Sequence, residues 1–126
     1  MKAFFKYHLP VILYAVAVLV IPSLPGLSAP TVRFLASDKI AHFLEYAVFA
    51  FLAFRSLSHS GRSRGWKSVA GLTFLLIAAF GVMDEAVQRF IPGRHPDIWD
   101  YAADLAGTLV SLAVLSWLAA RGAPNE

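Results

Sequence analysis

The chain has 126 residues, of which 58% are hydrophobic and only 15% are charged, and its formal net charge is +3. A soluble domain usually carries about 25% charged and 45–50% apolar residues, so this composition excludes an ordinary soluble domain and indicates one small membrane domain. The absence of cysteine excludes disulfides and cysteine nucleophiles. The basic residues lie mostly in short runs beside apolar segments, where they set membrane topology, so no nucleic-acid partner is predicted.

Four apolar segments follow one another along the chain, each near the roughly 20 residues that cross the hydrocarbon core. The first also resembles a signal peptide, but its apolar run is long for one and Pro30 would follow the cleavage point, so we expect a retained helix. Segments rich in turn residues separate the four. The sequence therefore predicts an all-α, integral membrane four-helix bundle in a single domain. The expected spans are residues 4–21, 39–57, 66–91 and 98–120 of a domain covering residues 1–126.

Lysine and arginine are unevenly distributed between the two sides of such a bundle. Cytoplasmic loops carry an excess of these residues, so the richer side is expected to be cytoplasmic. This predicts a multi-pass protein of the bacterial cytoplasmic membrane with both termini inside. The richer side holds Lys2, Lys6, Arg55, Arg62, Arg64, Lys67 and Arg121, and the outer side holds Arg33, Lys39, Arg89 and Arg94.

The acidic residues gather at the expected outer ends of the last three spans, with Glu126 as the exception. Asp38, His42 and Glu45 share one helix face because they are four and three residues apart. A charged side chain within a membrane helix costs roughly 2.5–3.5 kcal/mol, so such residues turn toward the bundle interior and pair there. The polar faces of the three spans are therefore expected to point at one another.

Three of these carboxylates lie at a similar depth. Glu45 lies seven residues after Asp38, Asp104 seven after Asp97 and Asp84 seven before Ile91, which places each about 10 Å inward at 1.5 Å per residue. They cannot all be ionised and unpaired in a medium of low dielectric constant. Protons, neighbouring basic residues or a bound cation must compensate.

Two sequence blocks, "DKIAHFLEYAVFAFLAF" and "DEAVQRFIPGRHPDIWDYAADLAGTLVS", resemble the signature blocks of VanZ-like integral membrane proteins. The resemblance covers about residues 37–112, and it departs from the family pattern at Asp104, where an asparagine is usual. The family's name comes from a protein associated with resistance to teicoplanin, a glycopeptide antibiotic, so the resemblance implies action at the cell envelope. The matching residues are Asp38, Lys39, His42, Phe43, Tyr46, Glu85, Gln88, Pro92, Arg94, Asp100 and Gly107.

Structural explanations remain open for several of these groups. Asp38 and Lys39 are also typical of a helix start. Arg94 either grips an anionic ligand or pairs with an acidic neighbour, Asp97, Asp100 or Glu85. Carboxylate metal centres in four-helix bundles use two Glu-x-x-His motifs plus further glutamates, whereas this chain has one His-x-x-Glu pair. No metal or other cofactor is therefore predicted.

We expect a protein that binds or modifies a membrane lipid or lipid-linked cell-wall precursor. A membrane hydrolase or transferase, a small ion- or proton-coupled transporter and a purely structural membrane partner are the alternatives, and the oligomeric state is left open. The catalytic candidates are His42, Glu45 and Glu85, and the ligand-binding candidates are Asp38, Lys39, Asp84, Gln88, Arg94, Asp100 and Asp104. Aromatic residues that fit interfacial belts are Tyr7, Tyr14, Trp66, Trp99, Tyr101 and Trp117.

Overall fold

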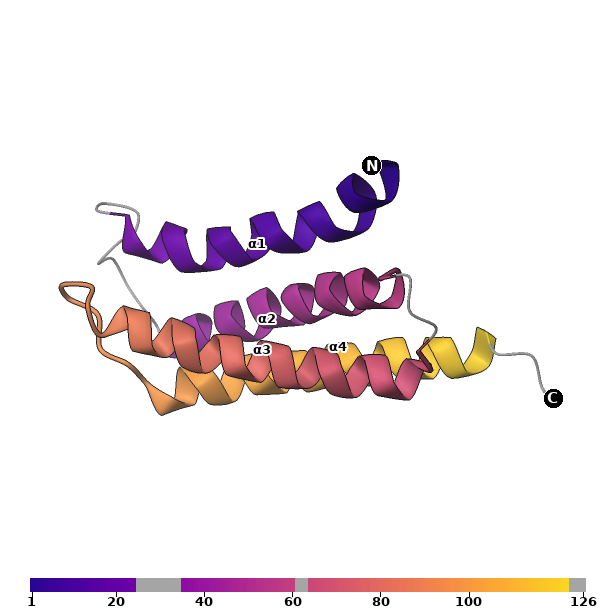
Figure 1. Cartoon of the computed structure of the whole chain (residues 1–126). Helices are drawn as coiled ribbons and strands as arrows, with labels where there is room; N and C mark the ends of the chain where they lie inside the picture. The colour runs from indigo at the N-terminus through magenta and orange to yellow at the C-terminus, as the bar shows by residue number, and fades with distance from the viewer. Residues whose placement is uncertain (25–34, 61–63, 123–126) are drawn as a thin grey trace.

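The computed structural model describes residues 1–24, 35–60 and 64–122, and these are arranged as four long helices (Figure 1). The first begins with a π-helical turn, Phe4–His8, and ends in a short 3-10 turn, Ile21–Ser23. The α-helices are α1 (Leu9–Val20), α2 (Leu35–Ser58), α3 (Trp66–Gln88) and α4 (Ile98–Gly122).

All four helical segments are long and apolar enough to cross a membrane. Large apolar side chains cover their outward faces; Leu44 on α2, Leu75 on α3 and Leu109 on α4 are each more than half exposed. Polar residues such as Asp104 and Thr108 are instead almost completely buried. A soluble protein rarely exposes so much contiguous apolar surface. The fold is therefore the predicted integral membrane bundle.

The N-terminal turn, the end of α2, the start of α3 and the end of α4 lie at one end of the bundle, and the α3–α4 connection lies at the other (Figure 1). This arrangement agrees with an even number of spans. Which end faces the cytoplasm stays a prediction from the distribution of lysine and arginine.

Two of the expected helix bounds differ from the structure by three residues or more. Helix α2 begins at Leu35 rather than Lys39, since no proline or glycine separates these residues. Helix α3 ends at Gln88 rather than Ile91. Pro92 lacks an N–H donor and disfavours helical backbone at the residue before it. The last residues of the predicted third span therefore form tight turns, in which the Ile91 N–H bonds the Gln88 carbonyl.

The most extensive helix contact joins α2 and α4. Gly107 makes it possible, because a Cβ atom at that position would collide with the backbone carbonyl oxygen of Phe43. Backbones approach this closely in membranes where small residues line the interface. Phe43 follows His42 directly, and Asp104 lies one turn before Gly107. The contact therefore also brings the polar residues of α2 and α4 together.

Two tyrosines expected in interfacial belts join helices to each other by hydrogen bonds. The Tyr14 hydroxyl of α1 donates to the carbonyl oxygen of Glu45 at 3.0 Å, and the Tyr101 hydroxyl of α4 donates to the carbonyl oxygen of Ala78 at 3.1 Å. A phenol hydroxyl that is partly buried usually finds such an acceptor, and the place of both rings relative to the membrane interface stays a prediction. Beside Tyr14, α1 contributes Val18 to the apolar core.

Candidate functional site

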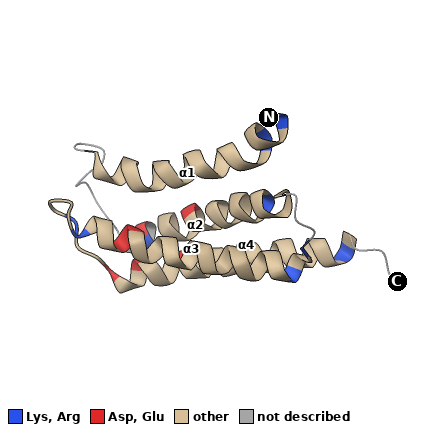
Figure 2. Cartoon of the chain, viewed as in Figure 1, with Lys and Arg blue, Asp and Glu red and all other residues tan. Residues whose placement is uncertain are grey.

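The carboxylates of the described residues gather toward the end of the bundle away from the termini (Figure 2). Asp38 and Asp100 occupy the first turns of α2 and α4, where the positive end of the helix dipole favours negative charge. Asp97 caps α4, since its Oδ1 accepts the Trp99 N–H at 2.9 Å. Helix-end electrostatics thus accounts for these three acids, but not for those one to two turns deeper.

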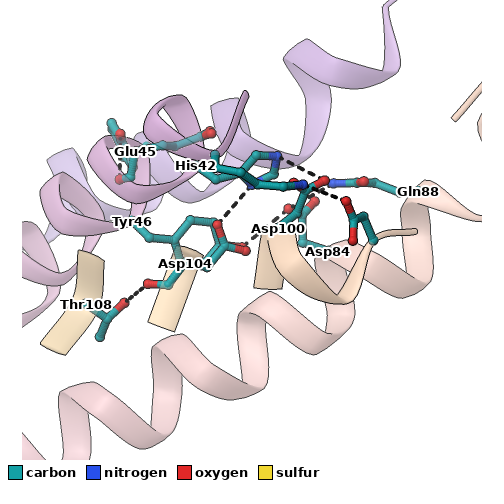
Figure 3. A network of polar contacts seen from close by, with 11 residues as sticks. His42, Glu45, Tyr46, Asp84, Gln88, Asp100, Asp104 and Thr108 are labelled. Atoms are coloured by element: carbon teal, nitrogen blue, oxygen red, sulfur yellow. Dashed lines mark hydrogen bonds and ion pairs between the residues drawn. The ribbon is translucent and has the colours of Figure 1, made fainter. Parts of the chain in front are cut away.

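A buried histidine joins α2 to α4. His42 Nδ1 lies 2.9 Å from Asp104 Oδ1, and its Nε2 lies 3.7 Å from Asp100 Oδ2, so the imidazole stands between two carboxylates (Figure 3). The three residues are 8%, 1% and 7% exposed, respectively. Thr108 donates to the backbone carbonyl of Asp104 at 2.8 Å. Asp104 thus fixes the orientation of the His42 ring.

Lys39 contacts two carboxylates at the start of α4, those of the capping residue Asp97 and of Asp100 in the first turn. Its Nζ lies 2.6 Å from Asp97 Oδ2 and also contacts Asp100 Oδ1. The hydrogen bond from Lys39, together with the bond from the Trp99 N–H, lowers the pKa of Asp97. The sequence suggested that Lys39 would hold an anionic ligand, but its ammonium group already serves these two partners.

A second polar cluster links α2 to α3. Asp84 Oδ2 accepts from the Tyr46 hydroxyl at 3.3 Å and from the Gln88 side-chain amide at 3.4 Å. All three side chains are at most 5% exposed. Their long distances describe weak hydrogen bonds, so they leave Asp84 with capacity to accept from a ligand.

A cavity of about 160 Å³ opens beside these clusters, with walls from α1, α2, α3 and the α3–α4 loop. Arg94 reaches it from the loop, yet its Nε is buried without a hydrogen-bond partner. Within the described part of the chain, Arg94 also forms no ion pair. The expected alternative, pairing with an acidic neighbour, is therefore not seen there. The remaining polar lining is Asp38, His42, Glu45, Asp84 and Gln88.

Glu45 and Glu85, the other two proposed catalytic residues, lie in different surroundings from each other. Glu45 lines the cavity but turns toward α1, where it also borders a hollow with Tyr14. Glu85 lines a separate groove of about 570 Å³ with Arg89 and Tyr101. The structure thus places His42 with Asp104 and Asp100, and Glu45 shares a cavity with His42, whereas Glu85 lies in the separate groove.

Sequence reasoning left two contributors out of the site. Tyr46 belongs to the first sequence block and lies one turn after His42, so helical spacing was a usable signal for its place in the interior. Asp97 was named as an alternative partner of Arg94, and its role as a partner of Lys39 needed the loop geometry.

A model of the VanZ/LLP1 family matches residues 4–119, and this range contains both sequence blocks and all four helices up to the last residues of α4. The chain belongs to the VanZ/LLP1 family. No curated protein and no solved structure matches it. In this VanZ/LLP1 protein the two sequence blocks supply the polar residues of α2, α3 and α4 that meet at one end of the bundle.

Proposed function

We propose that this VanZ/LLP1-family protein binds the phosphate-bearing headgroup of a membrane lipid or lipid-linked cell-wall precursor. The headgroup enters the cavity at the polar end of the bundle, which faces outward from the bacterial cytoplasmic membrane. The family's association with teicoplanin resistance extends the proposal to altered display of glycopeptide targets at the cell surface.

The observation that carries this proposal is the buried Nε of Arg94, which has no hydrogen-bond partner among the described residues. Buried polar groups are nearly always hydrogen-bonded, and a buried exception needs an explanation. Arginine binds phosphate through paired N–H groups, so a headgroup phosphate satisfies the group that the described residues leave without a partner. Opposite Arg94, Asp84 and Glu45 can accept from headgroup hydroxyl or ammonium groups.

The size of the cavity fits this role. A volume of about 160 Å³ corresponds to about five water molecules at roughly 30 Å³ each. This suits a small polar headgroup whose acyl or prenyl chain stays in the surrounding lipid. The exposed apolar surface of the helices provides the contact for that chain.

A second candidate function is a hydrolase or transferase acting on the same headgroup. The observation that favours it is the His42–Asp104 pair at 2.9 Å, since a carboxylate that orients an imidazole is a common arrangement for general acid–base catalysis. Under this reading His42 moves a proton for an attacking water.

The binding test uses purified protein in lipid nanodiscs and two matched probes, a polyprenyl phosphate and the corresponding polyprenyl alcohol. We expect the wild type to prefer the phosphate and Arg94→Gln to lose that preference. Arg89→Gln is the control, because Arg89 is exposed at the same end of the bundle. Equal binding of both probes by the wild type, or an unchanged preference in Arg94→Gln, would refute the proposal.

Turnover separates the two candidate functions. The wild type and His42→Ala are incubated with lipid-linked envelope intermediates, and release of the headgroup is followed. Headgroup release by the wild type that is lost in His42→Ala would establish that the protein is an enzyme. Binding without turnover across the panel supports a binding protein.

A further inference from the structure

Three potential metal ligands from two helices converge at the polar end of the bundle. Asp38 and His42 are one turn apart on α2, and Asp100 lies in the first turn of α4. One ligand atom from each residue lies within 4.8 Å of the other two. His42 and Asp100 are 8% and 7% exposed, so the group is not a solvated acidic patch.

A second observation concerns the free nitrogen of His42. Its Nδ1 is occupied by Asp104, while Nε2 has no hydrogen-bond partner among the described residues and faces Asp100 Oδ2 at 3.7 Å. That distance is too long for a hydrogen bond. The second imidazole nitrogen of this buried residue therefore faces a carboxylate oxygen at a separation that an ion bound by both atoms would span.

The spacing suits two ligands of one ion. Zinc binds nitrogen and oxygen at about 2.0–2.2 Å, so neighbouring donors on a tetrahedral ion lie about 3.5 Å apart. The 3.7 Å separation of His42 Nε2 and Asp100 Oδ2 is close to that value. The hydrogen bond from Nδ1 to Asp104 resembles the carboxylate–histidine–metal arrangement in which an outer carboxylate orients the ligating ring.

Lys39 leaves this arrangement intact. Its ammonium group contacts Oδ1 of Asp100, whereas Oδ2 is the atom that faces His42. The two oxygens of Asp100 therefore face different groups: Oδ1 faces the Lys39 ammonium and Oδ2 faces the His42 imidazole. Asp38 completes the group from the wall between the 160 Å³ cavity and a neighbouring hollow that Asp100 lines.

We propose that Asp38, His42 and Asp100 form a binding site for a divalent transition-metal ion of the zinc or manganese class. One imidazole with two carboxylates suits these ions, and three protein ligands leave a position open toward the cavity. The site goes beyond the proposed headgroup binding, because the metal ion is expected to bind in the absence of any headgroup. The sequence led us to expect no metal, because the chain lacks a second Glu-x-x-His motif. In the structure the third ligand is instead Asp100, which lies on a different helix from Asp38 and His42.

The test titrates purified, tag-free protein with Co²⁺ and with Zn²⁺ alone, with no lipid ligand added. We expect one ion per chain, a Co²⁺ absorption spectrum of low coordination number, and at least about tenfold weaker Zn²⁺ binding in Asp38→Asn and His42→Gln. His95→Ala is the matched control, because His95 is an exposed imidazole at the same end. Thermal unfolding of each variant confirms that the fold is retained, and Asp38→Asn, at a half-buried helix start, is the variant least dependent on packing.

Arg94→Gln distinguishes this proposal from the proposed function, since it removes the phosphate contact and leaves the three ligands in place. Zn²⁺ affinity should not fall in that variant, because removing a positive charge from a cavity that Asp38 and His42 also line does not weaken the binding of a cation. Equal Zn²⁺ affinity in the wild type, Asp38→Asn and His42→Gln would overturn the metal site. His42 would then be an imidazolium held between Asp100 and Asp104.

Discussion

Replacing Gly107 by alanine should separate α4 from α2 and damage the polar site at a distance. The new Cβ would lie 2.9 Å from the carbonyl carbon and 3.1 Å from the Cα of Phe43, and nearer still to the carbonyl oxygen. Carbon atoms in ordinary contact lie about 3.5–4.0 Å apart, so the helices must move by on the order of 1 Å. Overpacking typically costs about 1–3 kcal/mol, and losing the His42–Asp104 hydrogen bond adds about 1.5–3 kcal/mol, giving about 2.5–6 kcal/mol in all.

The assay is unfolding of the purified protein in mixed micelles, followed by helical circular dichroism. Gly71→Ala is the matched control on α3, because its Cβ meets nothing within 4 Å. Gly81→Ala should fall between them, since its Cβ meets the Tyr101 ring at 2.9 Å and that side chain can give way. If Gly107→Ala unfolds at the same denaturant fraction as Gly71→Ala, the close approach of α2 and α4 is refuted.

Two further changes test the electrostatics of the site. Asp104→Asn keeps an oxygen that can accept from His42 and should lower the unfolding free energy by about 1 kcal/mol or less. Asp104→Lys buries an unpaired charge at a position that is 1% exposed, and it should lower the unfolding free energy by about 3–5 kcal/mol. Equal unfolding curves of the two variants in micelles would contradict this account. Because Lys39 lowers the pKa of Asp97 in the folded protein, that carboxylate stabilises the fold above its ordinary pKa of about 4 and ceases to do so as pH falls through the lowered value. The difference in melting temperature between the wild type and Asp97→Asn should therefore shrink on acidification below about pH 4, and a difference that grows there would exclude the Lys39 contact as its source.

Hydropathy and helical spacing were sufficient to predict the four spans and the convergence of α2, α3 and α4. A charged residue inside the bilayer must find a partner, so acids one and two turns from a helix end had to turn inward. The buried Asp84 and Asp104 confirm that expectation. In a membrane protein, the helical spacing of acidic residues therefore predicts which faces of the helices point into the bundle.

The same spacing was too coarse to assign partners. His42 and Glu45 are three residues apart, which leaves them about 60° apart around a helix of 3.6 residues per turn. That rotation directs His42 to Asp104 on α4 and Glu45 toward α1. Asp84 and Glu85 differ by about 100° for the same reason, and they line separate hollows.

Contacts that depend on loops or on α1 had no signal in the sequence. The α3–α4 turn decides that Asp97 meets Lys39 and that Arg94 enters the cavity. The hydrogen bond from Tyr14 to the Glu45 carbonyl depends on how α1 lies against α2. Such contacts join residues far apart in the chain, and periodicity within a helix does not encode them.

The central claim, an outward-facing polar site for envelope headgroups, is tested most directly by the side of the membrane on which the α3–α4 loop lies. Single cysteines replace His95 in that loop and Ser60 after α2, both exposed positions at opposite ends of the bundle. The wild-type chain has no cysteine, so labelling has no background. In intact spheroplasts, His95→Cys should react with a membrane-impermeant maleimide and Ser60→Cys should react only after lysis. Labelling of Ser60→Cys alone would place the site on the cytoplasmic side and contradict the account.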